Sequence, residues 1–317
     1  KHRSNWGVGF SHVGFSTARG GAGLGSLRTD EGTMLPVAVR FLDEQRTFEQ
    51  QLSFFSYLPL SRTRRLELSA SGSRFSFVTI RNADYFFERQ RVLDERFRLP
   101  KSPDIFTGSV GLAYVGDNTN LGPVSPMRGQ RFRFGGEANF GPLQLQTLTA
   151  DYRHYVRLSP FTLAARGLYL GRTGRDATSG FLPPLFVGVP TLARGYALPR
   201  TWRTDGSRVS QGDMQGRNMA VGNVELRFPL TGHPRLAAFR SGFFPSEVPL
   251  FADPGMAWGR PIPPRSSMLA AEADRAWRPV PVSSTGVSLR VNLLGFLILE
   301  PFYAVPWQKG RTITQGT

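Results

Sequence analysis

The chain has 317 residues, no cysteine and a formal net charge of +16, from 39 Lys and Arg against 23 Asp and Glu. The lack of cysteine excludes disulfides and thiolate zinc sites, and the four His residues, at positions 2, 12, 154 and 233, form no ligand group. The basic residues are scattered, with RTRR at 62–65 as the densest cluster. We therefore expect no metal, no cofactor and no nucleic-acid partner.

Alternation of apolar and polar residues, the pattern of strands with two different faces, runs through most of the chain. In RFRFGGEANF, Arg131 and Arg133 point away from Phe132 and Phe134. The predicted strands are 5–16, 33–43, 47–58, 64–80, 104–116, 131–140, 143–158, 161–174, 217–230, 247–259, 284–293 and 295–306, with a possible further strand at 311–317. The sequence therefore predicts an all-β fold of about twelve strands.

The segments between these strands differ in length. GGAGLG at 20–25 is predicted as a flexible turn, and a β-bulge is expected near Gly72, where the alternation changes phase. Tight turns are predicted at LPLSRT, FGPLQ and LLGF, and long loops at 81–103, 175–216 and 260–283. Short turns on one rim and long loops on the other are typical of membrane barrels.

A soluble β-sandwich and a membrane β-barrel share this alternation, but strand length and aromatic placement differ between them. Several predicted strands reach about ten residues, enough to cross a membrane at a tilt. Aromatic residues cluster near strand ends in FFSYLPL, DYRHYVRL, MAWG and FYAVPW, and no apolar run approaches the length of a membrane helix. An antiparallel transmembrane β-barrel is therefore favoured over a sandwich.

Three motifs, in order, resemble signatures of the BamA-like superfamily of outer-membrane assembly and two-partner secretion barrels: LARGY at 192–196, NVELRFPL at 223–230 and FADPG at 251–255. NWGVGF, YLPLSRTRRLEL and DYRHYVRLSPFTLAARG resemble a branch of this superfamily, of the bacterial surface antigen type, that is often fused to TolB-like propellers. The resemblance implies a barrel of sixteen strands in a bacterial outer membrane. Residues 1–317 would supply about 12–13 of them as one domain, with N-terminal strands and any periplasmic domain missing and the last strand incomplete.

The resemblance also implies that loop 175–216 folds into the barrel lumen and carries Arg194 to the wall. The alternation places Glu225 and Asp253 on one face of their strands. Because a buried guanidinium requires an acidic partner, we expect Arg194 to pair with Asp253 first and with Glu225 second.

The neighbours of these residues have expected roles in the same latch. Gly195 would allow a sharp turn at the loop tip, and the ring of Tyr196 would pack there while its hydroxyl finds a partner. Phe251 and Gly255 flank Asp253 on the wall, and Gly255 would leave room for the loop.

No catalytic motif occurs in the sequence, so we expect no enzyme. The resemblance implies insertion or translocation of polypeptides at the outer membrane, with the lipid bilayer and other outer-membrane or periplasmic proteins as partners. Two alternatives remain: a structural barrel that anchors a larger outer-membrane complex, and a diffusion channel that prefers anions.

Overall fold

The computed structural model describes residues 4–28, 32–88, 90–178, 182–196, 211–241, 243–259, 279–308, 311–312 and 315–316. Almost all of the regular structure is β-strand, which confirms the all-β prediction. The strands are β1 (Asn5–Arg28), β2 (Met34–Pro59), β3 (Arg64–Phe87), β4 (Gln90–Arg98), β5 (Ile105–Asp117), β6 (Asn120–Leu121), β7 (Pro126–Phe140), β8 (Leu145–Leu158), β9 (Phe161–Thr173), β10 (Leu185–Phe186), β11 (Gln215–Gly216), β12 (Asn218–Gly232), β13 (Phe239–Arg240), β14 (Ser246–Trp258), β15 (Val282–Ser288), β16 (Arg290–Leu293), β17 (Leu297–Leu299), β18 (Phe302–Gln308), β19 (Arg311–Thr312) and β20 (Gln315–Gly316). A short 3-10 helix, η1, covers Gln211–Met214. No helix in the described part of the chain is long and apolar enough to cross a membrane.

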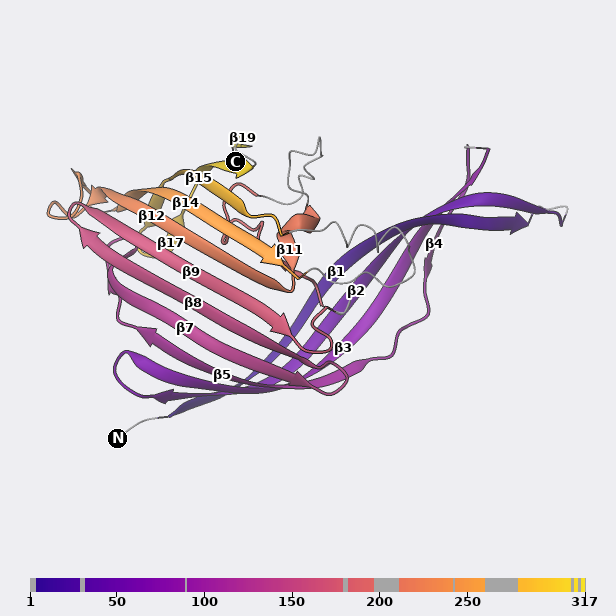
Figure 1. The fold of residues 1–317 in the computed structure, drawn as a ribbon, viewed down its shortest axis with the longest axis horizontal. Coiled ribbons are helices and arrows are strands. Elements are labelled where there is room, and N and C mark those ends of the chain that lie inside the picture. The colour runs from indigo at the N-terminus through magenta and orange to yellow at the C-terminus, as the bar shows by residue number, and fades with distance from the viewer. Residues whose placement is uncertain are drawn as a thin grey trace.

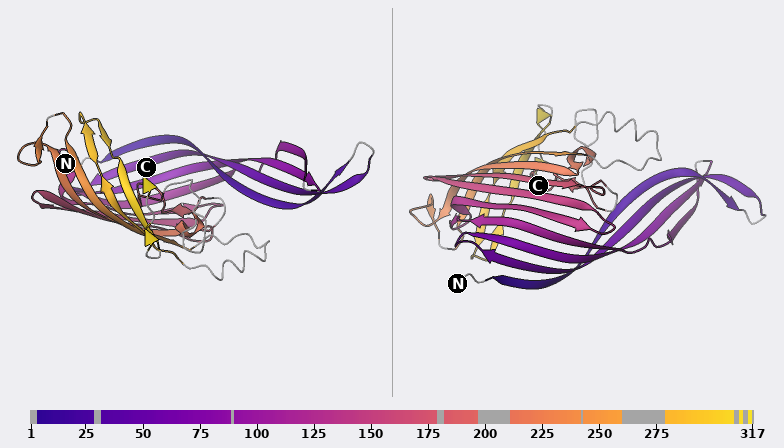
Figure 2. Two further views of the ribbon diagram at one scale, coloured as in Figure 1. Left: turned by 90° about the horizontal axis from the view of Figure 1, so that it is seen from above. Right: turned by 60° about the horizontal axis from the view of Figure 1, so that its bottom comes forward.

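Eighteen strands form one sheet, and β10 pairs with β11 apart from it. Antiparallel neighbours follow one another as β1, β2, β3, β5, β7, β8, β9, β12, β14, β15 and β18. This sheet curves into a wall, so that the yellow C-terminal strands lie behind the magenta ones (Figures 1 and 2). Within the described residues no strand pairing joins β1 to β18, β19 or β20, so the wall is open along this seam.

We call the rim that carries the 174–217 connection the loop rim, and the opposite rim the turn rim. The tight turn at 60–63 and the turn at 294–296 lie on the turn rim, as predicted. FGPLQ, between β7 and β8, instead lies on the loop rim, because β7 runs toward that rim. The separation of short turns from long loops is therefore incomplete.

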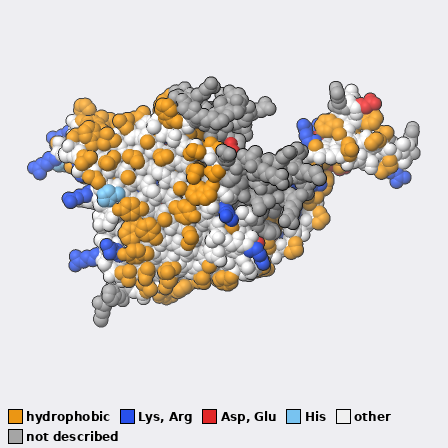
Figure 3. Space-filling model, viewed as in Figure 1, with side chains coloured by type: hydrophobic (Ala, Val, Ile, Leu, Met, Phe, Trp, Pro, Cys, Tyr) orange, Lys and Arg blue, Asp and Glu red, His pale blue; other side chains and the backbone are white. Residues whose placement is uncertain are grey.

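The two faces of the wall carry opposite chemistry. The outward face exposes large apolar side chains, which Figure 3 shows spread over the sheet. They include Trp6, Phe10, Leu52, Phe54, Phe106, Leu112, Phe134, Leu148, Leu163, Leu226 and Leu250. An exposed apolar surface of this extent is not found on ordinary monomers in water, and it fits contact with lipid. The inward face carries charged and hydroxyl side chains such as Ser109, Asp151, Arg166 and Glu225.

The first three strands are longer than predicted and extend beyond the loop rim (Figure 1). Segments 33–43 and 47–58 form the single strand β2, and 20–25 lies within β1, paired with β2, rather than in a turn. The predicted loop 81–103 contains the end of β3 and all of β4, which pair as a hairpin. We call the projecting part, residues 13–28, 34–49, 76–87 and 90–98, the arm. At about 3.3 Å per residue, the arm part of β3 is about 40 Å long.

The phase change near Gly72 has a different cause from the expected bulge. The pairing of β3 with β2 and with β5 runs through Gly72 without a register shift. Instead the apolar face switches sides: Leu68 points outward below Gly72, whereas Phe75 and Phe77 above it point inward and are buried. The strand therefore leaves the continuous apolar band at this level, and its outward face in the arm mixes polar residues such as Asn82 and Asp84 with apolar ones such as Val78 and Ile80.

Candidate functional site

The loop between β9 and β12 turns back into the lumen. Its described part is held by the β10–β11 pair and by a hydrogen bond from the Val187 amide to the Met214 carbonyl, 3.1 Å long. A small buried apolar cluster joins the loop to the inner wall; it consists of Leu185, Val187, Ala193, Tyr196 and Met214 from the loop and Met219, Val221, Ala257 and Val282 from the wall. This packing fixes the turn at 191–196, whose tip carries Arg194.

Arg194 is 7% exposed and binds Asp253, which is 0% exposed, through both sides of its guanidinium fork. Its Nε lies 2.7 Å from Asp253 Oδ2 and its Nη2 lies 2.8 Å from Oδ1, while the Arg194 amide donates to Oδ2 at 3.2 Å. Nη1 is 2.9 Å from Glu225 Oε1 and 3.4 Å from Glu300 Oε1. The structure thus brings Arg194 to both expected carboxylates, with the bidentate contact to Asp253 and a single nitrogen to Glu225.

The wall residues beside Asp253 shape the site around the guanidinium. The Arg194 Cζ atom lies 3.5 Å from the centroid of the Phe251 ring, a cation–π contact. Gly195 has φ +91, and a Cβ there would lie 3.1 Å from the Ala304 Cβ. A Cβ at Gly255 would lie 2.8 Å from the Val187 Cγ1, so this glycine makes room for the loop. The part of the loop that it accommodates is Val187, which precedes the tip.

Tyr196 connects the loop tip to two strands beyond β14. Its hydroxyl donates to the Ser283 carbonyl of β15 at 2.8 Å and accepts from the Ser283 amide at 3.2 Å. It also lies 3.3 Å from the Trp307 carbonyl of β18. Since Ser283 and Trp307 pair across β15 and β18, the hydroxyl caps the end of that ladder.

The electrostatics of the loop tip favour a charged Arg194 and a neutral Tyr196. Burial lowers the pKa of Arg194, but the hydrogen bonds and negative charge of Asp253 outweigh it, so the pKa is raised overall. Burial raises the pKa of Tyr196 to about 12, against a smaller lowering by the Ser283 backbone hydrogen bond. Both groups therefore keep these states at physiological pH.

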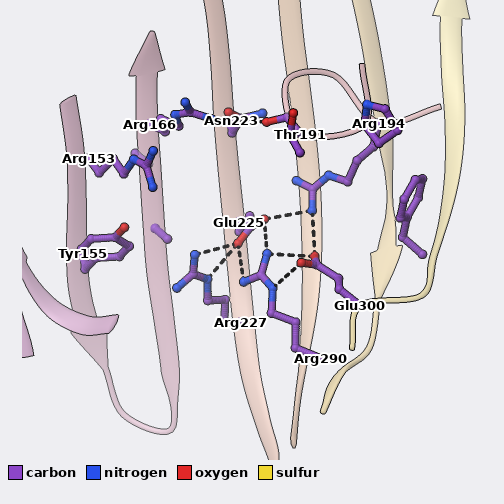
Figure 4. Close-up of a pocket in the computed structure, with 14 residues that line it drawn as sticks. Arg153, Tyr155, Arg166, Thr191, Arg194, Asn223, Glu225, Arg227, Arg290 and Glu300 are labelled. Carbon is purple, nitrogen blue, oxygen red and sulfur yellow. Dashed lines mark hydrogen bonds and ion pairs between the residues drawn. The ribbon is translucent and has the colours of Figure 1, made fainter. Parts of the chain in front are cut away.

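The structure adds a charge network that the sequence did not indicate (Figure 4). Glu225 accepts not only from Arg194 but from Arg227 Nε at 2.8 Å and Arg290 Nη2 at 2.8 Å. Arg290 Nε is 2.8 Å from Glu300 Oε2, and its Nη1 is 3.2 Å from Glu247 Oε1. These residues come from four strands or their ends, so only the sheet register brings them together. The sequence signals for them are weak: the alternation of NVELRFPL places Arg227 on the face of Glu225, and Glu300 interrupts an apolar stretch in LILEPF.

A cavity of about 340 Å³ lies beside the network and is lined by Arg153, Tyr155, Arg166, Glu225 and other inward residues. Arg153 and Arg166 both bind Asp151, with Nη2 to Oδ2 distances of 2.8 and 3.0 Å. The cations of this region are thus paired with carboxylates. Among the described residues no group of acidic or imidazole side chains could hold a metal ion. The arrangement is suited to holding a loop in place.

Residues 44–315 match the Omp85 superfamily domain. The fold is similar to the crystal structure of BamA from Haemophilus ducreyi lacking POTRA domains 1-3, with 12% identity and a TM-score of 0.45, covering 99% of this chain and 68% of that one. A comparison with curated proteins gives no match. Since the family match spans most of the sequence, in agreement with the resemblance seen in its motifs, the chain belongs to the Omp85 superfamily.

Proposed function

We propose that this protein is an outer-membrane β-barrel that acts in the insertion or translocation of polypeptides, and that its Arg194 loop tip is a latch between the lumen loop and the barrel wall. The observation that carries the proposal is the buried Arg194–Asp253 pair in a chain of the Omp85 superfamily. The bilayer is the solvent that the outward apolar face requires.

The latch would connect the loop to the strands on the C-terminal side of the wall. Arg194 binds β12 and β14, and Tyr196 binds β15 and β18. A loop tip that contacts four consecutive strands stabilises one curvature of the wall, because a change in strand spacing would stretch several short charged contacts. This gives the latch a direct mechanical link to the shape of the barrel.

A second function, anchoring of a larger outer-membrane complex, is favoured by one specific observation. The arm projects beyond the loop rim, and every residue of its strand β4 is exposed, including the charged Arg91, Asp94, Glu95, Arg96 and Arg98. A wide diffusion channel is less well supported, because the loop tip and its charge network occupy the lumen.

Depletion of the protein, followed by measurement of the folded levels of other outer-membrane proteins, tests the proposal. Complementation with Arg194→Ala should restore assembly poorly, since the latch is lost. The matched control is Arg81→Ala, which removes an Arg–Asp pair in the arm with 30% and 18% side-chain exposure. Normal assembly after depletion would contradict insertion or translocation of these clients and would leave anchoring as the function to test.

A further inference from the structure

A second segment enters the lumen, from the opposite rim. The connection of β5 to β7, residues 118–126, lies on the turn rim and contains β6. It folds inward across the lumen and contacts strands on the far side of β8 and β9. The Ser125 hydroxyl donates to Glu247 Oε2 on β14 at 2.9 Å, and Asn292 Nδ2 on β16 donates to the Pro123 carbonyl at 2.7 Å. We call residues 118–126 the inner turn.

Arg227 ties the inner turn to the wall most closely. Its Nη1 donates to the Ser125 hydroxyl at 2.9 Å and to the Pro126 carbonyl at 3.2 Å. Arg227 is 8% exposed and Glu247 is 7% exposed, so these contacts are shielded from water. Charged hydrogen bonds of this kind are worth about twice neutral ones. The inner turn is thus bound to the inner wall by sequence-distant partners.

The inner turn and the loop tip contact the inner wall at different heights. Glu247, beside Ser125, lies six residues before Asp253 on β14, about 20 Å at the rise of an antiparallel strand. A cavity of about 700 Å³ is bounded on the turn side by Leu121 and Ser125 and also borders Arg290 and Glu300 of the charge network. Arg194 lines the smaller cavity of about 340 Å³, which shares Arg290 and Glu300 with this one, so the loop tip and the inner turn border adjoining cavities of the lumen.

One carboxylate joins the two closures. Glu225 Oε1 binds Arg194 of the loop tip, and Glu225 Oε2 binds Arg227, whose other nitrogen binds the inner turn. Arg290 bridges the same carboxylate to Glu247, the partner of Ser125. When the loop tip leaves, Glu225 loses Arg194 and can shift toward Arg227; when the inner turn leaves, Arg227 loses Ser125 and can shift toward Glu225. Either change alters the contacts of the other segment.

We propose that the inner turn is a second plug of the lumen, in series with the loop-tip latch and coupled to it through Glu225. Each of two plugs in series blocks the pore, so releasing one leaves the pore blocked by the other even though the contacts of the remaining plug are weakened. Passage requires both to move, and Glu225 is the residue whose loss loosens both together. This inference rests on the proposed placement in a membrane but not on any polypeptide client.

Ion conductance of the full-length protein in planar lipid bilayers tests the plug directly. The turn is removed by replacing 119–129 with Asn-Gly, which closes the hairpin at the hydrogen bond between the Asn118 amide and the Gln130 carbonyl. The latch is released by Arg194→Met. We expect little conductance from either change alone, and from the double variant a rise several-fold greater than the sum of the two single increments. Glu225→Gln should raise conductance by itself, whereas the arm variant Arg81→Met should not.

Four outcomes would overturn the inference. If Arg194→Met alone reaches the conductance of the double variant, the inner turn closes nothing. If turn removal has no effect in either background, the same conclusion holds. If the protein does not enter bilayers, both the membrane placement and this inference are wrong. If the protein assembles clients but the double variant shows no more than the sum of the single increments, only this inference is wrong. Heat-modifiable migration in electrophoresis checks that each variant is folded.

A reversible crosslink gives a second measurement that does not depend on deleting chain. Residues 1–317 contain no cysteine, so Ser125→Cys and Glu247→Cys introduce the only thiols within them. In the Arg194→Met background, joining them with a thiol-cleavable bis-methanethiosulfonate reagent should hold conductance low, and reduction should raise it in the same membrane. Equal conductance before and after reduction would contradict a plug at the turn rim.

Discussion

The Arg194–Asp253 pair allows a quantitative test of the latch. Replacing Asp253 with Leu leaves a buried guanidinium without its bidentate partner, and breaking such a pair costs about 3–5 kcal/mol. Arg194 keeps Glu225, 2.9 Å away, so we expect the lower end, about 3 kcal/mol. Arg194→Met should lower the free energy of unfolding by a similar amount, because Asp253 then loses its main hydrogen-bond donors. Asn223 Nδ2, 2.9 Å from Asp253 Oδ1, remains as a donor.

A double-mutant cycle separates the pair from the packing around it. If the two side chains interact directly, the double variant loses the pair only once, and the coupling should be about 3 kcal/mol, more than a hundredfold in the folding equilibrium. The free energy of unfolding is measured by urea titration of the reconstituted protein.

The control cycle uses Arg81→Met and Asp43→Leu, a pair with equally short contacts of 2.6 and 2.7 Å but more exposed side chains. The coupling free energy between these two control residues should be about 1 kcal/mol or less. A coupling for Arg194 and Asp253 no larger than this control would refute the reasoning that burial makes the latch strong.

Three further predictions address the loop tip and the membrane band. Because the pKa of Tyr196 is raised to about 12 from 10.0, its contribution to stability should be complete below about pH 10 and be lost as the pH rises through 12; melting curves should show this loss in the wild type and not in Tyr196→Phe. Gly195→Ala should cost about 1–3 kcal/mol because of its positive φ, whereas Gly23→Ala, with open space around it, should change the unfolding free energy by less than about 0.5 kcal/mol. Leu112→Arg on the outward wall should destabilise by about 2–4 kcal/mol in a bilayer, and Leu42→Arg on the arm should not; equal effects would place both residues in the same solvent.

The alternation of the sequence was sufficient to predict the inward faces of β7, β12 and β14. It placed Glu225 and Asp253 on one side, because a strand has a strict two-residue period. The motif LARGY supplied the third partner only through its resemblance to a family. Residues within one strand were therefore predictable from local pattern, and the loop tip was not.

The features that the sequence did not predict depend on the register between strands and on whether lipid or water surrounds each strand. Arg290 joins Glu225 because β16 pairs with β14, and Glu300 does so because it precedes β18, which pairs with β15; no local pattern fixes these pairings. Strand β2 was predicted as two pieces because its polar middle, at 44–47, interrupts an alternation that continues beyond it with its faces exchanged. The inner turn was missed for the same reason as the network, since its partners lie more than a hundred residues away.

The unbroken length of β2 and β3 has a consequence for how the molecule bends. The two strands are hydrogen-bonded in one register from the turn rim to the arm, and β1 follows β2 along the whole of its own length. Such a ribbon is stiff in the hydrogen-bonding plane, so it moves as one rigid body. A sideways force on the arm is therefore transmitted along β2 and β3 to the free edge of β1. A partner that pulled on the arm would therefore change the width of the open seam without touching the wall.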